Sequence, residues 1–559
     1  MINQNHLEYM KRHINSRPNI IILIIASIYL SPSLFLYFVS EDIKFAILFI
    51  ENTFFENLKN IWFPSGEFLN KGNLFRPIIS SINLFEYYLW GINPLGYHFI
   101  NGLIHTINSV LIYRLSLILL KKNNVALLSA LIFVFHPILG HSIFWISGRT
   151  DMLALSFYLL SLINASSFIE QNSFKKLILV QVLFLCAMLT KEVSITLPLA
   201  QVWMIFWKKN YIKLSEDFRK YIIKLIASST VVFSIFLYYR SSIFNQNPFI
   251  IDSIYTIGGL SQLVTNMIKI GSFLTVPFGH AWFEMKVMNY KTYAIILMVP
   301  FLVKSCIYLF NNRSRQYKII MLTVLLLISV LPLFSLTMRW YLYIPVSFFS
   351  IVLATLIIKI KNKSKFAYSL SVFYLITFIL GSVLNYKIWL NNARIGREVV
   401  NGLEDQIKMN DNIETIAILN FPSKVNRVAT FVDGFESLIK LKTGSSKKII
   451  RPTNVIHNSA MKPTDVNIIE DGFVINTCEE SSYFLLGDNE QRLGLRSFNP
   501  GDEVKMSSGT VNIQKVNDMG KPVRVALKLD QDILNKNTLF LKFDEINNEF
   551  KVIKKYIYI

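Results

Sequence analysis

The stretch 20–38, IIILIIASIYLSPSLFLYF, decides the fold class, because it is a nearly unbroken apolar run. A helix needs about 20 mostly apolar residues to cross the hydrocarbon of a bilayer. Lys11, Arg12 and Arg17 precede the run, and basic residues favour the cytoplasmic side. The run is too long for a removable signal peptide and lacks a small-residue cleavage site. We therefore expect a retained first helix and a cytoplasmic N-terminus.

Composition extends this interpretation to most of the chain. The 559 residues are 52% hydrophobic, 14% aromatic and 17% charged, and the mean hydropathy is +0.41. These values exclude a disordered chain, a collagen-like repeat and an ordinary cytosolic enzyme. The three cysteines, Cys186, Cys306 and Cys478, lie too far apart in the sequence to suggest a disulfide framework or a thiolate metal cluster.

The net charge of +21 is a topology signal and not a sign of nucleic-acid binding. Residues 1–387 hold 34 Lys and Arg against 14 Asp and Glu, whereas residues 388–559 hold 23 against 22. The excess of positive charge therefore lies entirely in the apolar part, where short basic loops report orientation in the membrane.

Eleven more apolar runs follow the first. They lie near 97–119, 125–145, 152–169, 177–190, 193–207, 221–239, 258–277, 291–310, 319–336, 341–358 and 367–387. If all twelve crossed, the basic loops around Arg313 and Lys361 would face opposite sides of the membrane. Treating 258–277 as re-entrant or interfacial returns every basic loop to the cytoplasm. We therefore expect a polytopic α-helical membrane protein with about eleven transmembrane helices.

Two segments outside the helices stand out. The long first outer loop, about 40–96, is rich in Trp and Tyr, which suits helices at the headgroup level. After residue 387 the pattern changes to short β-rich runs separated by turn residues. These runs lie near 414–420, 427–432, 467–476, 483–486, 510–516, 522–529 and 538–543, with a short helix near 435–442. The sequence thus predicts a transmembrane domain, 1–387, and an exported β-rich (α+β) binding or positioning domain, 388–559.

Ionisable residues at membrane depth are expensive and are functional candidates. The acid pair Glu41 and Asp42 opens the first outer loop, and further polar residues recur at the outer ends of separate helices. They are Arg76, His98, His105, His136, His141, Arg149, Asp151, Lys191, Glu192, Arg339 and Tyr341. A carboxylate that faces several cations suits transfer of a group from a phosphate. The acid takes the acceptor's proton, and the cations hold the departing phosphate.

Each candidate also has a structural alternative. The acid pair could be a solvated helix cap, and Arg149 with Asp151 a surface pair plus an N-cap. Lys191-Glu192 could mark an outer turn, and the histidines at 98, 105 and 136 could be satisfied interior residues. Arg76 and Arg339 could be interfacial anchors, and the tyrosines at 341 and 343 belt aromatics. Arg240, which ends a helix, is interpreted as a boundary charge.

Several short motifs, taken in order, resemble the GT-C superfamily of membrane glycosyltransferases. They are FRP at 75–77, YLWGINPLGYH at 88–98, LIHTIN at 103–108, FHP at 135–137, WISGRTD at 145–151, TKE at 190–192 with LPL at 197–199, and RWYLYIP at 339–345. The similarity is greatest to the O-mannosyltransferase-like branch, whose animal members carry TPR repeats, although no TPR repeat is present here. It covers roughly residues 35–387 and not the exported domain.

The resemblance implies that an acid at the start of the first outer loop is catalytic. The matching positions are Glu41 and Asp42, with Asp42 as the general base and Glu41 as its helper or a metal ligand. Two positions depart from the family's pattern: His141 stands where relatives usually carry an acid, and Met338 where they usually carry Glu. Either change bears on metal use or substrate.

The working hypothesis is an inverting transferase that moves a sugar from a polyprenyl-phosphate donor to an acceptor hydroxyl on the outer face. Arg76, Arg149, Lys191 and Arg339 would bind the donor phosphate. The sequence establishes no cofactor and does not decide the metal requirement, and a divalent metal could bind Glu41 and Asp42 with His98 or His141. The Lys-, Asn- and Ile-rich composition suggests a bacterial inner membrane, with the C-terminal domain on the periplasmic side.

Three other functions remain open from the sequence. A secondary transporter would show internal repeats and broken helices at the bilayer midplane. A lipid-linked glycan polymerase or ligase would place its large loop later in the chain. A non-catalytic scaffold would use the membrane helices only to present the β-rich domain.

Overall fold

The computed structural model describes the chain in fifteen stretches. They are residues 16–50, 52–64, 75–209, 218–244, 259–276, 313–334, 338–361, 364–425, 428–431, 434–457, 461–477, 482–486, 497–506, 508–534 and 537–556. The chain divides into two compact units. The helical unit comprises Met1–Leu34, Asn52–Leu89 and Gly96–Asn385, and the β-rich unit comprises Phe35–Glu51, Trp90–Leu95 and Tyr386–Ile559.

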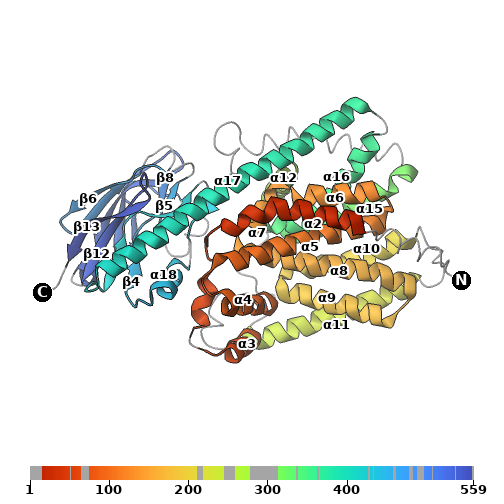
Figure 1. Ribbon diagram of the computed structural model, residues 1–559, viewed down its shortest axis with the longest axis horizontal. Helices are drawn as coiled ribbons and strands as arrows, with labels where there is room; N and C mark the ends of the chain where they lie inside the picture. Colours follow the sequence, from red (N-terminus) through yellow and green to blue (C-terminus); the bar gives the residue numbers. More distant parts are fainter. Residues whose placement is uncertain are drawn as a thin grey trace. The chain divides into compact units, whose positions relative to one another are not determined.

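The helical unit is a bundle of α-helices joined by short 3-10 segments (Figure 1). Its first half contains α2 Ser16–Leu30, η1 Ser31–Phe35, α3 Phe54–Trp62, α4 Pro77–Trp90, α5 Pro94–Leu120, α6 Asn123–Val134, η4 Pro137–Leu139, α7 Gly140–Ile143, η5 Ile146–Gly148 and α8 Arg149–Gln171. The second half contains α9 Phe174–Thr190, η6 Glu192–Thr196, α10 Leu197–Lys209, α11 Phe218–Phe244, α12 Leu260–Thr275, α15 Arg313–Val330, η8 Leu331–Leu333, η9 Arg339–Leu342, α16 Tyr343–Lys361 and α17 Lys365–Met409. Residues of α17 from Tyr386 onward belong to the β-rich unit.

Six helical segments within the described stretches are long and apolar enough to cross a membrane. They are Arg17–Phe35, Pro94–Leu120, Ile146–Gln171, Arg219–Ile243, Arg339–Lys361 and Lys365–Met409. A seventh is formed if Asn123–Val134 and Pro137–Ile143, bent by 45°, count as one span. The bend coincides with Pro137, which cannot donate a helical hydrogen bond. The chain is a multi-pass membrane protein, as predicted.

The predicted total of eleven crossings is not confirmed. The apolar run 291–310 lies outside the described residues. The run 258–277 contains α12, whose 16 residues are fewer than a full crossing requires. Its predicted re-entrant or interfacial position stays a prediction.

Helices of the helical unit pack closely around small and polar interior residues. α8 packs against α9 and α10, α9 against α11, and α16 against α6 and α15. Asn108 of α5 donates from Nδ2 to the Met152 carbonyl of α8, and its Oδ1 accepts from the Ser156 hydroxyl. Such amide contacts satisfy polar groups that the bilayer cannot. They fix the start of α8, which carries several candidate site residues.

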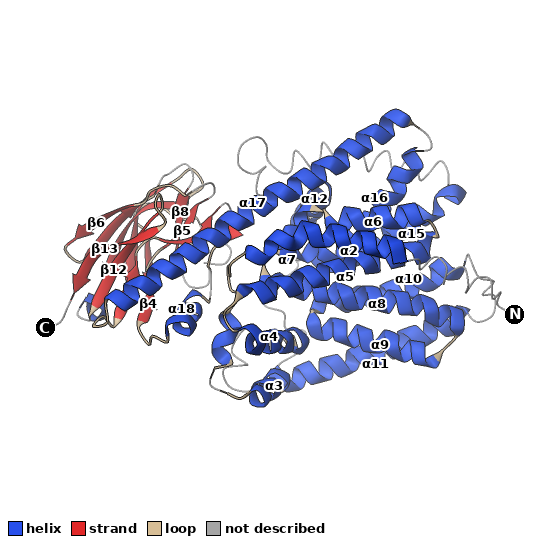
Figure 2. Ribbon diagram, in the orientation of Figure 1, coloured by secondary structure: helices blue, strands red, loops and turns tan. Residues whose placement is uncertain are grey.

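The β-rich unit contains the described strands of the chain (Figure 2). Its elements are η2 Lys44–Leu48, β1 Thr415–Ile418, β2 Phe421–Val425, β3 Val428–Ala429, α18 Phe435–Thr443, β4 Lys448–Ile450, β5 Asn454–His457, β6 Asp465–Ile469, β7 Gly472–Asn476, β8 Ser482–Leu485, β9 Glu503–Met506, β10 Gly509–Val516, β11 Pro522–Leu529, α19 Gln531–Leu534, β12 Thr538–Asp544 and β13 Glu549–Tyr556. The strand orders are β13-β12-β1-β4, β6-β7-β11-β10-β9 and β3-β2-β5-β8. The predicted β-rich C-terminal region is confirmed.

One core joins these sheets. In the antiparallel pair β10 and β11, Val511 is opposite Leu527 and Ile513 is opposite Val525, and all four side chains are buried. Alternate residues of a strand point to opposite faces, so this spacing gives each strand one apolar face. Phe473 of β7 and Phe540 of β12 pack in the same core, with ring centroids 5.0 Å apart and ring planes tilted by 44°.

Two details of the predicted strands differ in the structure. The run 467–476 is not one strand but the hairpin β6–β7, which turns at Glu470 and Asp471. Within the run 427–432, residues 428–431 are described, and of these only Val428–Ala429 form a strand, β3. The short helix expected near 435–442 is present as α18.

The compact units also divide the chain differently from the two segments expected from the sequence. Residues 35–51 and 90–95, parts of the predicted first outer loop and its borders, are grouped with the C-terminal residues. Whether a functional boundary lies at 387/388 stays a prediction.

Candidate active site

Lys191 and Asp151 form a buried ion pair in the helical unit. α9 ends at Thr190, and Lys191 is extended (φ −160°, ψ 134°) before η6 begins. Asp151 lies in the first turn of α8. The Lys191 Nζ atom is 2.5 Å from Asp151 Oδ2, and the two side chains are 4% and 2% exposed. Because a buried charge is costly unless it is paired, each group requires the other.

A second ion pair joins Arg76 to Glu192. Arg76 Nη2 and Nε donate to Glu192 Oε2 at 2.8 and 3.1 Å. Glu192 begins η6 directly after Lys191, so the two ion pairs meet at the junction between α9 and η6. Arg76 also interacts electrostatically with Asp151. The structure therefore brings four predicted residues from three separate segments into one group.

The short helix η9 adds an aromatic side chain to this group. The Lys191 ammonium lies 4.3 Å from the centroid of the Tyr341 ring, which is a cation–π distance. On the same helix, Arg339 Nη1 lies 3.4 Å from His141 Nε2. We call Arg76, Asp151, Lys191, Glu192 and Tyr341 the charge cluster.

The charge cluster contains unused acceptor atoms. Asp151 Oδ1 and Glu192 Oε1 are buried and have no hydrogen-bond partner among the described residues. Buried polar atoms are usually paired, so an orphaned acceptor requires an explanation. Two cations and two acids balance in charge, and two acid oxygens remain able to accept hydrogen bonds. These two oxygens can therefore accept hydrogen bonds from the hydroxyl donors of a ligand.

Arg149 occupies a different, closed environment. Its side chain is 1% exposed and pairs with Glu86 of α4 through Nη1 and Oε2. Its Nε donates to the Ile146 carbonyl and its Nη2 to the Tyr97 carbonyl, both at 3.1 Å. Arg149 thus joins α4, α5 and the start of α8. A donor phosphate would have to compete with these acceptors, and a phosphate role for Arg149 stays a prediction.

The candidate histidines divide into several environments. His105 of α5 has its Nδ1 atom 2.7 Å from the Tyr343 hydroxyl and stacks on Phe133. The His136 Nε2 atom is 3.1 Å from the Leu274 carbonyl. These contacts fit the interior-histidine alternative for both residues. His98 is fully buried in α5, and His141 faces Arg339.

The break between α7 and α8 is held in place by backbone contacts. Asn101 Nδ2 donates to the carbonyls of Ile143 and Trp145 at 3.1 and 3.2 Å. A Cβ atom at Gly148 would lie 2.7 Å from the Ser142 backbone, so only glycine fits there. This close approach fixes Asp151, three residues further on.

Sequence reasoning missed several partners of the candidate residues. Glu86, the counter-ion of Arg149, is not among the predicted site residues. Arg240, interpreted as a boundary charge, interacts electrostatically with Glu192. Asn101 and Asn108 lie seven residues apart on α5, so they share one helix face, and polar residues in an apolar helix could have revealed them.

The acid pair Glu41 and Asp42 belongs to the β-rich unit. Asp42 is 2% exposed, and its Oδ2 accepts from the Val39 N–H at 3.0 Å. Glu41 is half-buried. Because the charge cluster belongs to the other unit, the predicted approach of Asp42 to the cations stays a prediction. The stretches that the structure describes contain no group of three His, Cys, Asp or Glu side chains arranged to hold a metal.

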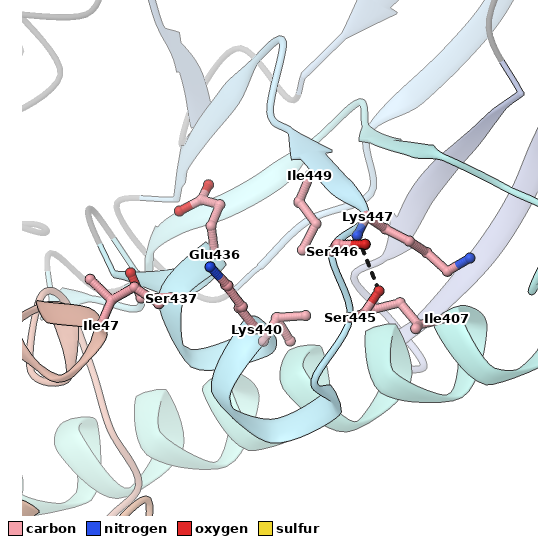
Figure 3. Close-up of a pocket in the computed structure, with 10 residues that line it drawn as sticks. Ile47, Ile407, Glu436, Ser437, Lys440, Ser445, Ser446, Lys447 and Ile449 are labelled. Carbon is pink, nitrogen blue, oxygen red and sulfur yellow. Dashed lines mark hydrogen bonds between the residues drawn. The ribbon is translucent and has the colours of Figure 1, made fainter. Parts of the chain in front are cut away.

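A cavity of about 310 Å³ lies within the β-rich unit (Figure 3). Its lining comes from η2, α17, α18 and the segment leading into β4, and combines isoleucines with hydroxyl and charged side chains. The lining residues are Ile47, Ile407, Glu436, Ser437, Ile439, Lys440, Ser445, Ser446, Lys447 and Ile449. Lys447 Nζ donates to the carbonyls of residues 410, 411 and 413, so it holds the turn that follows α17.

Comparison with known proteins places the charge cluster in context. Residues 81–239 match the family model described as dolichyl-phosphate-mannose-protein mannosyltransferase. The predicted resemblance to GT-C membrane glycosyltransferases is confirmed. The matched segment contains Asp151, Lys191 and Glu192 of the charge cluster, as well as Arg149.

Curated relatives are similar to part of the chain. Protein O-mannosyl-transferase TMTC1 of Homo sapiens is 32% identical over 133 residues, which is 22% of this chain and 15% of the relative. Protein O-mannosyl-transferase TMTC3 of Mus musculus is 27% identical over 204 residues, covering 34% of this chain and 22% of the relative. The chain therefore spans less than a quarter of the length of these relatives.

A solved structure of an Archaeoglobus fulgidus oligosaccharyltransferase tethered with an acceptor peptide is also similar. The identity is 11%, the TM-score is 0.40, and the alignment covers 77% of this chain and 63% of that chain.

Proposed function

We propose that this protein is a membrane glycosyltransferase. It would move a sugar from a polyprenyl-phosphate donor to an acceptor hydroxyl on the outer face of the membrane. The charge cluster is the observation that carries this proposal. It combines two cations, two acids with unused oxygens and an aromatic ring. Three of its members lie in the segment that matches the mannosyltransferase family.

The donor phosphate would bind to Lys191 and Arg76, with Arg339 as a third cation. Arg and Lys form strong charge-assisted hydrogen bonds to phosphate oxygens. Donors fixed before the reaction stabilise the charge that develops on the departing phosphate. The family model is described by a dolichyl-phosphate-linked sugar, which supports a lipid-linked donor here.

The orphaned oxygens of Asp151 and Glu192 suit the sugar of the donor. Sugar hydroxyls are hydrogen-bond donors, and a carboxylate oxygen accepts such bonds strongly. A sugar phosphate supplies both an anion for the cations and hydroxyls for the acids. This double match favours a phosphate-linked sugar over a simple phosphate ester.

Asp42 would act as the general base. It takes the proton of the acceptor hydroxyl while the acceptor oxygen attacks the anomeric carbon. The bond from that carbon to the phosphate oxygen breaks, and polyprenyl phosphate leaves with the bonding electrons. A single displacement of this kind inverts the anomeric configuration. Because phosphate is a good leaving group, no separate general acid is needed.

The experiment is transfer of a labelled sugar from polyprenyl-phosphate donors in membranes that contain the full chain. Asp42→Asn keeps the size of the side chain but removes the base, so we expect a loss of about 10²- to 10⁴-fold in rate with normal expression. Asp518→Asn, at an exposed turn of the β-rich unit, is the control and should keep the wild-type rate. Wild-type transfer by Asp42→Asn would remove Asp42 from the mechanism.

A further inference from the structure

The segment that carries Asp42 is built into the β-rich unit, although it follows the first membrane helix in the sequence. The Ser40 N–H donates to the Thr430 carbonyl at 2.8 Å. Thr430 is itself held by Asn392 of α17, because its hydroxyl donates to Asn392 Oδ1 at 2.9 Å. Asn392 Nδ2 donates to the Val425 carbonyl at 2.7 Å. A buried chain of hydrogen bonds thus runs from α17 to the turn that contains Asp42.

Close packing reinforces these hydrogen bonds. A Cβ atom at Gly396 of α17 would lie 3.4 Å from the Phe38 carbonyl oxygen. Arg397 Nη2 donates to the Phe35 carbonyl at 3.2 Å, and its guanidinium lies 5.5 Å from the centroid of the Tyr37 ring. Residues 35–38 therefore pack against α17 and are held there by these contacts.

The other side of Asp42 is fixed by α18. η2 packs against α18, and Ile47 of η2 lines a cavity together with Ser437 and Lys440 of α18 (Figure 3). Gly434, which precedes α18, adopts φ +82°. A Cβ atom there would lie 3.1 Å from the Lys44 backbone nitrogen. Lys44 is two residues from Asp42, so the start of α18 sets the position of η2.

The turn itself is internally ordered. Asp42 Oδ2 accepts from the Val39 N–H, and Ser40 adopts the left-handed φ of +57°. A non-glycine residue takes this conformation at a cost, and it persists where its surroundings hold it. Contacts on both sides supply that support.

We infer that the β-rich unit positions the proposed general base, Asp42, and that Gly434 at the start of α18 is a positioning residue. This inference rests on the proposed function for the role of Asp42. The donor cations belong to the helical unit. A disturbance at Gly434 should therefore lower kcat and leave the donor KM unchanged. A misplacement of about 1 Å can cost on the order of 100-fold in rate.

The chain offers a matched pair of glycines for the test. Gly434 and Gly444 lie at the two ends of α18, with φ of +82° and +65°. A Cβ atom at Gly444 would meet nothing within 4 Å, whereas one at Gly434 meets Lys44. Gly434→Ala and Gly444→Ala therefore carry similar backbone strain. Only Gly434→Ala also places an atom in close contact with Lys44, in the segment that contains Asp42.

Both variants are measured as full chains in proteoliposomes. We expect Gly434→Ala to lower kcat at least about 10-fold, with donor KM within 2-fold, and Gly444→Ala to keep wild-type values. Hydrogen–deuterium exchange should rise in residues 36–48 of Gly434→Ala only. Equal kcat for the two variants, or unchanged exchange in that segment, overturns the inference.

Two further outcomes separate this inference from the proposed function. If Gly434→Ala loses activity because it unfolds, exchange rises throughout strands β10 and β11 as well, and that result counts against a positioning role. If the wild-type chain transfers no sugar, the proposed function fails. The exchange in residues 36–48 then still decides whether α18 holds this segment.

Discussion

The Lys191–Asp151 pair permits a sharp separation of structural and functional roles. The perturbation is a set of three variants: Lys191→Met, Asp151→Leu and the double replacement. Removing one partner of a buried ion pair leaves an uncompensated charge, which costs about 3–5 kcal/mol. The pair is 4% and 2% exposed, so this range applies with little discount for solvent. Replacing both partners by apolar side chains should restore stability, because no buried charge remains.

Transfer activity should not return with stability. Loss of the Lys191 ammonium removes a hydrogen bond to a charged group, worth about 1.5–3 kcal/mol. At 1.36 kcal/mol for each factor of ten, kcat/KM should fall about 10- to 150-fold in the double variant. The assay combines thermal unfolding of the purified protein with transfer from a labelled lipid-linked sugar.

The control is Lys408→Met on α17. Lys408 is 66% exposed in its pair with Glu404, and such surface pairs contribute about 0–1 kcal/mol. The same chemical change should therefore alter neither stability nor transfer beyond that range. If the stable double variant at Lys191 and Asp151 kept wild-type transfer, the charge cluster would have only a structural role.

Two further predictions concern the supports of the site and of the β-rich unit. Gly148→Ala places a Cβ atom 2.7 Å from the Ser142 backbone, so we expect a loss of about 1–3 kcal/mol in stability and reduced transfer, measured by thermal unfolding and donor turnover. Gly259→Ala, where a Cβ atom meets nothing within 4 Å and φ is −58° as against −64° at Gly148, controls for the change of residue type. Burial lowers the pKa of His457 to about 4, below its usual value near 6.5. The unfolded chain then binds the proton more readily, so His457 should cost the β-rich unit up to about 3 kcal/mol as the pH falls from 6.5 to 4. Hydrogen exchange of β5, measured across this pH range in the wild-type protein and in His457→Gln, isolates this effect. Equal pH dependence of the exchange in the two proteins would contradict the prediction.

From the sequence, the charged candidate residues were predicted to lie at the outer ends of the helices. Charged side chains are costly within the hydrocarbon, so Asp151, Lys191 and Glu192 had to lie where an apolar run breaks. The sequence did not predict which cation pairs with which acid. Arg76 and Glu192 are 116 residues apart, and Arg149 and Glu86 are 63 apart. Such pairings depend on how the helices pack, and single-sequence periodicity does not contain that information.

The β-rich unit shows the same limit at shorter range. Long alternating strands such as β10 and β11 were predicted, because their buried positions recur every second residue. β4 and β5 were not, since three or four residues give too little alternation to distinguish from a loop. The incorporation of residues 35–51 into this unit had no local signal, because it depends on contacts with residues more than 350 positions away, such as Arg397 with Phe35.

The central claim is that the sugar arrives on a lipid phosphate. It is tested most directly with the full chain in liposomes, supplied with the same labelled sugar on polyprenyl phosphate or on a nucleotide. The account predicts transfer from the lipid donor alone, with one polyprenyl phosphate released for each sugar transferred. Transfer from the nucleotide donor, or sugar transfer without release of polyprenyl phosphate, would contradict it.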